Sequence, residues 1–314
     1  ASWRFDEAEA ALGTISSDEV ALEGGNAIAY AYVSAGRLAD AIALFEEVLA
    51  DSARILGAVH PSALTTRNNL AYAYMSVGRL ADAIALYEQT VADSVRVLGP
   101  DHPDTLVSRN NLAFIYELVG RFDEAITLRR QTLDDCVRTF GEEHAETLAS
   151  RSYLARAFRA AGRLDEAIPL YEEVLADRMR ILGPDHPDTL TSRGSLAYTY
   201  RSAGRLADAM ALYEEVLADR MRILGADHPD TLISRYNLAH ACWEAGRLDE
   251  AITLFEEVLA DQLRVLGPNH PYTVASRGYL ARAYREADRV DDAEAVLDLP
   301  TDPDDVDADR IESR

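Results

Sequence analysis

The sequence repeats itself every 42 residues, and this period constrains the fold more than any other feature of the chain. A Gly-Arg pair recurs at this spacing, at Gly36-Arg37, Gly78-Arg79, Gly120-Arg121, Gly162-Arg163, Gly204-Arg205 and Gly246-Arg247. A histidine keeps the same period, at His60, His102, His144, His186, His228 and His270. A fixed period of this length is typical of a solenoid, in which each unit packs on its neighbours. The length of 314 residues would by itself suggest two globular domains, and the repetition overrides that expectation.

Each repeat predicts two helices joined by a short turn. In the second repeat the first helix is expected from Pro61 to Val77 and the second from Leu80 to Leu98. Apolar residues recur at helical spacing in both segments. Proline suits the first turn of a helix, and Gly78 suits the left-handed position just after one. Because neither helix can bury its apolar stripe alone, we predict an all-α fold, an α-solenoid of stacked helix pairs.

Several core positions recur together in most units. In the second repeat they are Asn69-Leu70-Ala71, Tyr74, Gly78, Ala83 and Tyr87. This pattern resembles the signature of the tetratricopeptide repeat (TPR), in which a small-Leu-Ala-x-x-Tyr stretch is followed by Gly, Ala and an aromatic residue. The 42-residue period is similar to the variant found in kinesin light chains, which also carries NNLA and LG-x-x-HP. The resemblance runs from Ile28 to about Leu297 and implies a right-handed superhelix of antiparallel helix pairs.

The repeats divide the chain into three segments. Residues 1–15 are expected to form the second helix of a partial leading repeat. Residues 16–299 are expected to form a single solenoid of about seven helical hairpins. Residues 300–314 are acidic and contain Pro303, so we expect a mobile tail there.

The composition limits the classes of partner that the protein can bind. The chain has 54 acidic and 31 basic residues, a net charge of −23, which argues against binding nucleic acid or an anionic membrane. Every basic residue is arginine, which excludes a lysine Schiff base and a Walker-type phosphate loop. Cys136 and Cys242 give neither a disulfide framework nor a zinc spacing, and no apolar run is long enough to span a membrane. A cytoplasmic protein without a cofactor is the simplest interpretation, and the lysine-free, alanine-rich composition hints at a bacterial source.

Residues that recur in every unit are interpreted as scaffold. The histidines lie one repeat apart and cannot converge on a metal ion, so they are expected to be structural. Arginines form a second ladder with the same period, at Arg67, Arg109, Arg151, Arg193, Arg235 and Arg277. They are expected to pair with carboxylates between helices or between repeats, and the alternative is a role in the ligand groove. The Glu-Glu pairs beginning at Glu46, Glu172, Glu214 and Glu256 are read as a solvated outer face. Arg129 stands where other repeats place a core aromatic ring, and its guanidinium is expected to reach solvent.

The resemblance also implies a ligand groove lined by the first helix of each hairpin. The residues carried over to that face are Asn68, Asn69, Tyr72, Asn110, Asn111, Phe114, Arg156, Arg159, Tyr198, Arg201, Tyr236, Asn237, His240, Trp243, Arg282 and Arg285. Peptide-binding members of the family place an asparagine at the position of Asn69, Asn111 and Asn237 to hydrogen-bond the ligand backbone. The arginines are expected to grip carboxylates of the ligand, or alternatively to neutralise local ones. The rings are either binding residues or ordinary packing between helices.

No catalytic constellation is present, and we expect a non-catalytic protein. There is no G-x-S-x-G, H-E-x-x-H or glycine-rich phosphate motif. Three functions remain open. The chain is a scaffold that binds an extended, acidic protein or peptide segment in the groove, a sensor or assembly module of a larger bacterial signalling protein, or a solenoid that self-associates through its terminal repeats.

Overall fold

The computed structural model describes residues 18–298, and in that range the chain forms fourteen helices and no strand. The leading helix expected at 1–15 and the tail expected at 300–314 lie outside the described residues. The chain divides into two compact units that meet in sequence after Arg163, here called the N-terminal unit and the C-terminal unit. The predicted all-α solenoid of stacked helix pairs is confirmed within them.

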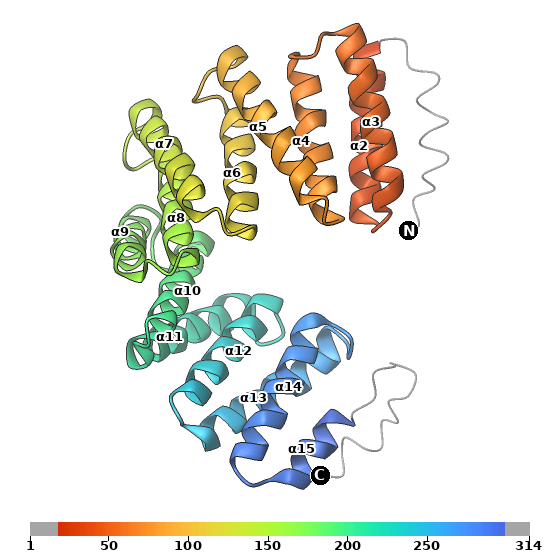
Figure 1. The fold of residues 1–314 in the computed structure, drawn as a ribbon. Coiled ribbons are helices and arrows are strands. Elements are labelled where there is room, and N and C mark those ends of the chain that lie inside the picture. The colour runs from red at the N-terminus through yellow and green to blue at the C-terminus, as the bar shows by residue number, and fades with distance from the viewer. Residues whose placement is uncertain (1–17, 299–314) are drawn as a thin grey trace. The chain divides into compact units, whose positions relative to one another are not determined.

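In the N-terminal unit each helix packs against the next, and neighbouring helices run antiparallel (Figure 1). The helices are α2 (Asp18–Ser34), α3 (Leu38–Ile55), α4 (Pro61–Ser76), α5 (Leu80–Val97), α6 (Pro103–Leu118), α7 (Phe122–Phe140) and α8 (Ala145–Ala160). The bounds expected for the second repeat differ from α4 and α5 by one residue at their ends.

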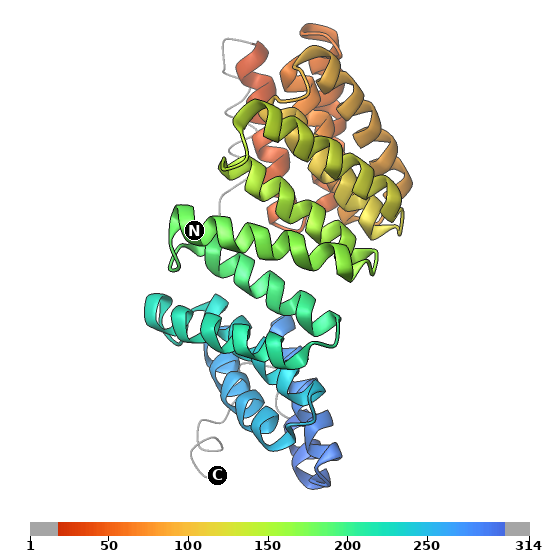
Figure 2. The same ribbon diagram turned by 90° about the vertical axis from the view of Figure 1, so that its left-hand side faces the viewer.

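The C-terminal unit repeats this arrangement, as the turned view in Figure 2 also shows. Its helices are α9 (Leu164–Leu182), α10 (Pro187–Ser202), α11 (Leu206–Leu224), α12 (Pro229–Glu244), α13 (Leu248–Val265), α14 (Pro271–Glu286) and α15 (Val290–Leu297).

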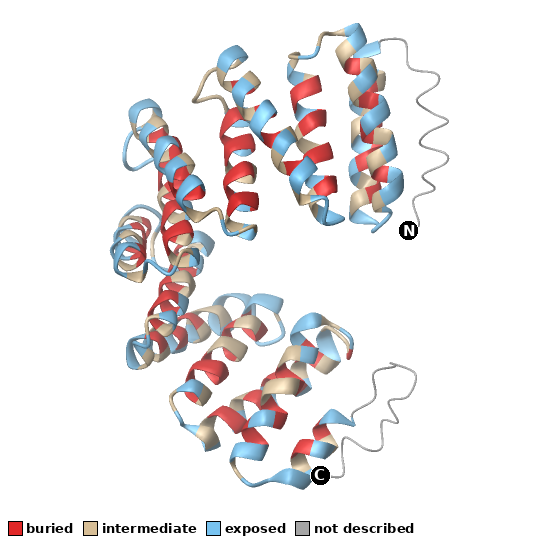
Figure 3. Ribbon diagram, in the orientation of Figure 1, coloured by how far each residue is buried: buried red, intermediate tan, exposed pale blue. Residues whose placement is uncertain are grey.

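The even-numbered helices, which are the first helices of the hairpins, also contact one another. In the N-terminal unit α4 touches both α2 and α6, and in the C-terminal unit α12 touches both α10 and α14. More residues are therefore buried on α4 than on α5, a difference visible in Figure 3. In each unit the even-numbered helices thus form one continuous surface, here called the first-helix face.

The histidine ladder caps these first helices. The Nδ1 atom of His60 accepts a hydrogen bond from the Ser62 N–H at 3.3 Å, and the other five histidines make the same contact two residues on, at 3.2–3.3 Å. A capping acceptor satisfies one of the N–H groups left free at a helix start. The structural interpretation of the ladder is confirmed, and no group of three metal-binding side chains occurs within residues 18–298.

The helices end in a left-handed residue. Gly78 has φ +80°, and the Arg79 N–H behind it donates to the Tyr74 carbonyl at 2.9 Å. In the last hairpin Asp288 adopts φ +59° and Arg289 makes the matching bond to Tyr284. Aspartate tolerates this conformation better than most residues, so the turn keeps its shape without glycine.

The second ladder lies between the two helices of a hairpin. Arg67 is buried and donates to Asp93 Oδ2 at 2.8 Å, and Arg109, Arg193 and Arg235 make the equivalent bond to the aspartate 26 residues later. These arginines are scaffold, as expected.

The Glu-Glu pairs are exposed, as expected, and the first glutamate of three of them also makes a contact that the sequence did not indicate. Glu46 accepts a hydrogen bond from the Tyr74 hydroxyl of the next hairpin at 2.6 Å, and the Arg79 guanidinium lies 3.9 Å from the Tyr74 ring centroid. Glu172 and Glu256 bind Tyr200 and Tyr284 in the same way. The first glutamate of these pairs therefore links adjacent hairpins, because the stacking brings a tyrosine hydroxyl to it.

Candidate ligand-binding face

The first-helix face carries rings that the core does not absorb. Tyr72 and Phe114 in the N-terminal unit are each 40% exposed, and Tyr198 in the C-terminal unit is 39% exposed. All three occupy the same repeat position, four residues before the first helix ends. Tyr30, at that position on α2, is still more exposed. Exposed rings at one register are typical of a binding surface, because aromatic side chains dominate binding hot spots.

The asparagines next to these rings pair with each other. Asn69 Nδ2 donates to Asn26 Oδ1, and Asn111 Nδ2 donates to Asn68 Oδ1, both at 3.2 Å. Each amide in such a pair keeps a donor or an acceptor for another partner. These asparagine pairs therefore help to join adjacent hairpins.

Arg129 is the largest departure from the sequence-based expectation. Its side chain is 2% exposed, so the guanidinium does not reach solvent. It donates through Nε to Glu117 Oε1 at 2.7 Å and through Nη1 to Asn110 Oδ1 at 3.1 Å. Burial lowers the pKa of Arg129 and the Glu117 carboxylate opposes that shift. The core keeps the cation because α6 supplies a carboxylate and an amide, which the α7 sequence alone could not reveal.

Arg156 on α8 joins the same cluster. Its Nε atom lies 3.4 Å from Glu117 Oε2, and its guanidinium lies 5.3 Å from the Phe114 ring centroid and 5.6 Å from that of Tyr153. One carboxylate is thus shared between two arginines. Arg159, one turn further along α8, is half-buried and completes the cationic residues predicted for this unit.

In the C-terminal unit the predicted residues gather around His240 on α12. The imidazole is 7% exposed, and its ring centroid lies 4.4 Å from that of Tyr279 and 5.6 Å from that of Trp243. The Nη1 atom of Arg201 on α10 donates to His240 Nδ1. Arginine can only donate, so Nδ1 accepts and the neutral ring carries its proton on Nε2. His240 is therefore part of the floor of this face.

The remaining residues of this group divide between packing and exposure. Tyr236 is half-buried and makes edge contacts with Phe255 and Tyr279, at 6.1 and 6.0 Å between ring centroids. Asn237 beside it is also half-buried. Arg201 lies 3.6 Å from Glu244 Oε1, so its charge is partly neutralised locally.

Arg282 and Arg285 on α14 are exposed, and neither forms an ion pair within residues 18–298. Arg282 lies over the Trp243 ring, 4.6 Å from its centroid, while the Trp243 indole N–H donates to Glu286 at 2.9 Å. The indole is held in place and the guanidinium stacked on it keeps its donors free.

Acidification should destabilise the C-terminal unit through His240. Burial, together with the charges of Arg201 and Arg282, lowers the pKa of His240 to about 4. A histidine with a lowered pKa resists protonation in the fold, so stability falls as the pH drops from about 6.5, the unfolded value, towards 4. The expected loss is about 3 kcal/mol by pH 4.

The test compares urea unfolding of the wild type and His240→Tyr at several pH values between 7 and 4. Tyrosine is the residue that Tyr72 and Tyr198 place at this register, and it does not titrate in this range. In the variant, the part of the pH dependence of the unfolding free energy that comes from His240 should be absent, and the part that comes from the carboxylates should remain. Parallel pH profiles for the two proteins would contradict the assignment.

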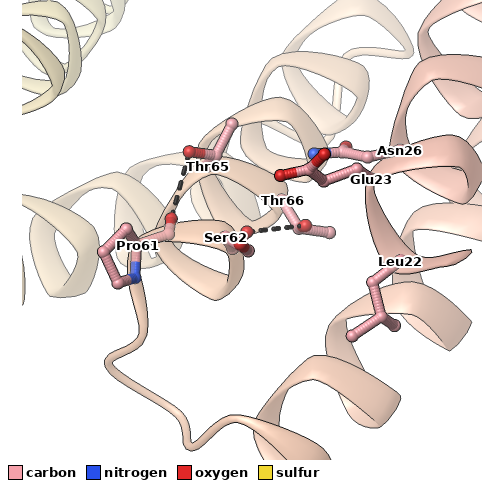
Figure 4. Close-up of a pocket in the computed structure, with 7 residues that line it drawn as sticks. All are labelled: Leu22, Glu23, Asn26, Pro61, Ser62, Thr65 and Thr66. Atoms are coloured by element: carbon pink, nitrogen blue, oxygen red, sulfur yellow. Dashed lines mark hydrogen bonds between the residues drawn. The ribbon is translucent and has the colours of Figure 1, made fainter. Parts of the chain in front are cut away.

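A small hollow lies between α2 and α4 in the N-terminal unit (Figure 4). Its volume is about 250 Å³, and it is lined by Leu22, Glu23, Asn26, Pro61, Ser62, Thr65 and Thr66. The hydroxyls of Thr65 and Thr66 donate to carbonyl groups of their own helix, at 3.1 and 2.9 Å. These hydroxyls are thus committed to the scaffold, and the other polar side chains that line the hollow are those of Glu23, Asn26 and Ser62.

One residue behind the face escaped the sequence-based prediction of the site. Arg129 was marked only as an irregular core residue, whereas its partner Glu117 had been placed on the groove with Asn110 and Phe114. The signal was present in the repeat itself, because a charged residue at a core aromatic position demands a partner of opposite charge nearby.

No helix within residues 18–298 is both long and apolar enough to cross a membrane. Cys136 and Cys242 are buried and free, and burial raises the pKa of both thiols.

Comparison with known proteins agrees with the repeat architecture described above. The tetratricopeptide repeat family model matches six overlapping segments, at residues 20–92, 62–134, 104–178, 153–221, 217–262 and 230–298. No curated protein sequence matches the chain.

Three solved structures are similar. Nearly identical TPR-like repeats assigned to a kinesin light chain of Podosopora anserina share 36% identity, with 65% of this chain and 97% of theirs covered and a TM-score of 0.57. BtubC (BKLC) from P. vanneervenii shares 21% identity, over 70% of this chain and 88% of its own, with a TM-score of 0.61. NprR in complex with its cognate peptide NprX shares 16% identity, over 93% of this chain and 81% of its own, with a TM-score of 0.56. The chain therefore belongs to the tetratricopeptide repeat family, with repeats of the 42-residue type found in kinesin-light-chain-like proteins.

Proposed function

We propose that this TPR solenoid is a non-catalytic scaffold that binds an extended protein or peptide segment on its first-helix face. The observation that carries the proposal is the register of exposed rings at Tyr72, Phe114 and Tyr198. Core positions elsewhere in these helices are buried, so rings left in solvent at one repeat position are available to a partner. NprR, which shares the fold, holds a peptide, which supports this use of the architecture.

The charges on this face favour an acidic segment. The protein carries a net charge of −23, yet Arg282 and Arg285 on α14 are exposed and form no ion pair within residues 18–298. Arg282 also lies over the Trp243 ring. A ligand carboxylate there would meet a guanidinium already oriented by the indole, and the repulsion from the rest of the protein would be offset locally.

The test is a selection from a random peptide library on the full chain, followed by affinity measurements with the selected peptides. Tyr198→Ala and Arg282→Ala should each weaken binding about tenfold, since anchoring rings and arginines carry most of the energy of such contacts. Replacing the acidic residues of the peptide by their amides should produce a loss of similar size.

Arg180→Ala is the matched control, because it removes the same charge from a second helix, where Arg180 pairs with Asp177 at 3.1 Å. Its affinity should stay within about twofold of the wild type. Selected peptides that bind Tyr198→Ala and Arg282→Ala as well as they bind the wild type would refute the proposed face. Selected peptides that tolerate loss of every acidic residue would refute the acidic ligand alone.

A further inference from the structure

The starting point is a position that every neighbouring hairpin fills with a ring. Phe45, Tyr87, Tyr213 and Phe255 are fully or almost fully buried there, and α7 alone among α3, α5, α7, α11 and α13 places an arginine, Arg129. A buried cation costs free energy unless it is paired. The cost suggests that the residue has a role that a ring could not supply.

The role follows from how Glu117 is shared. Arg129 holds Glu117 by a hydrogen bond of 2.7 Å, while Arg156 lies 3.4 Å from the other carboxylate oxygen and makes no hydrogen bond to it. Two cations therefore face one anion, and the cluster keeps one positive charge in excess. Arg129 Nη2 and Arg156 Nε are both buried without a hydrogen-bond partner in the described part of the chain.

The excess charge can reach a ligand only through Arg156. Arg129 and Glu117 are almost completely buried, whereas the Arg156 side chain is 33% exposed. The Arg156 guanidinium lies beside the exposed rings of Phe114 and Tyr153, 5.3 and 5.6 Å from their centroids. A planar anion between these rings would meet a guanidinium whose planar fork suits carboxylates.

No other described hairpin combines these residues. On α4 the position of Glu117 is taken by Met75 and on α12 by Trp243, while α5 and α13 keep the core ring. The cluster is therefore a local feature of α6, α7 and α8 and not a property of the repeat.

We propose that Arg156 is a carboxylate-binding subsite, and that Arg129 is a positioning residue that keeps Glu117 from neutralising it. The subsite takes a single carboxylate, from an aspartate or glutamate side chain or from the free C-terminus of a peptide. That the ligand is a peptide rests on the proposed function. That Arg156 binds a carboxylate does not depend on it.

The first experiment uses sodium acetate as the probe and the arginine Nε–Hε NMR signals of the full chain as the readout. Sodium chloride at the same ionic strength is the comparison. The Arg156 signal, assigned by its absence in Arg156→Ala, should shift saturably with acetate and not with chloride. Identical responses to the two salts would overturn the proposal.

The variants separate positioning from folding. Arg129→Tyr restores the ring of the other hairpins, so the urea midpoint should be equal or higher, yet acetate should bind about tenfold more weakly because Glu117 then pairs with Arg156. Arg129→Tyr with Glu117→Gln removes the competing carboxylate as well, and acetate binding should return. Arg130→Ala removes a cation at the neighbouring, exposed position and should leave acetate binding unchanged.

A role of Arg129 in folding alone predicts a different pattern. It predicts a lower urea midpoint for Arg129→Tyr and no recovery of acetate binding in the double variant, and that result would overturn the proposal. Unchanged acetate binding in Arg129→Tyr would overturn it too.

The source of the carboxylate is decided with peptides from the library selection, each prepared with a C-terminal amide and, separately, with its acidic side chains amidated. Loss of the Arg156 dependence with one form identifies the source. Acetate binding without any peptide binding would refute the scaffold function and leave the subsite standing. Peptide binding that is insensitive to Arg156→Ala, in a protein that does not bind acetate, would refute the subsite and leave the scaffold function standing.

Discussion

Placing an arginine at Tyr87 should unfold the hairpin of α4 and α5. Tyr87 is fully buried at the position that Arg129 occupies one repeat later. In the hairpin of Tyr87 the residue corresponding to Glu117 is Met75, so the new guanidinium would meet no carboxylate. We expect Tyr87→Arg to cost about 4 kcal/mol or more, since a buried unpaired charge is among the most destabilising changes in a core. The Tyr87 hydroxyl makes no hydrogen bond within residues 18–298, so its loss adds little.

The measurement is urea unfolding combined with hydrogen exchange. The exchange should accelerate first in the amides of α4 and α5, because stability in a solenoid is set by each hairpin and its neighbours. Adding Met75→Glu should recover about 2 kcal/mol or more in a double-mutant cycle, because it recreates the pair of Arg129 and Glu117. A cycle without coupling would show that the carboxylate is not what makes the arginine tolerable in α7.

The second large effect is expected at Arg67. Its guanidinium is buried and joins α4 to Asp93 on α5 at 2.8 Å and to the Ala58 carbonyl at 2.8 Å. Arg67→Ala removes the main partner of a largely buried carboxylate and leaves the carbonyl unpaired, so we expect a loss of about 3 kcal/mol in urea unfolding. Arg67, followed by Arg96, lowers the pKa of Asp93.

Arg96→Ala is the matched control, since Arg96 donates to the other oxygen of Asp93 at 2.9 Å but is mostly exposed. Its loss should stay below about 1 kcal/mol, as for other surface ion pairs. A group with a lowered pKa stabilises the fold above its unfolded pKa, so the gap between wild type and Arg67→Ala should narrow as the pH falls below about 4. Equal losses in the two variants, or a gap that widens in acid, would show that burial does not govern this pair.

The periodic residues allowed the most successful predictions. Helix bounds in the second repeat were placed to within a residue, because proline, glycine and the capping histidine act through bonds within a few residues of themselves. The structural role of the histidines was predicted for the same reason, since all six recur in one environment. The pairing of the arginine ladder is confirmed for Arg67, Arg109, Arg193 and Arg235, while Arg151 donates to Glu142 instead.

The sequence did not reveal contacts that a residue makes with another helix. Glu46 is exposed, as predicted, but the Tyr74 hydroxyl that donates to it belongs to the next hairpin and was not foreseen. The guanidinium of Arg129 was wrongly expected in solvent, because its partners Glu117 and Asn110 lie on the other helix of the same hairpin.

The sequence by itself determined the helical hairpins, their period and their membership of one family, because local propensity and a repeated apolar stripe leave few alternatives. Only the tertiary structure decided which charges are buried, paired or free. A charge is stabilised by the groups within a few ångströms of it, and for His240, Arg156 and Arg282 those groups come from helices that are distant in sequence. The chemistry of the first-helix face therefore depends on how the hairpins stack.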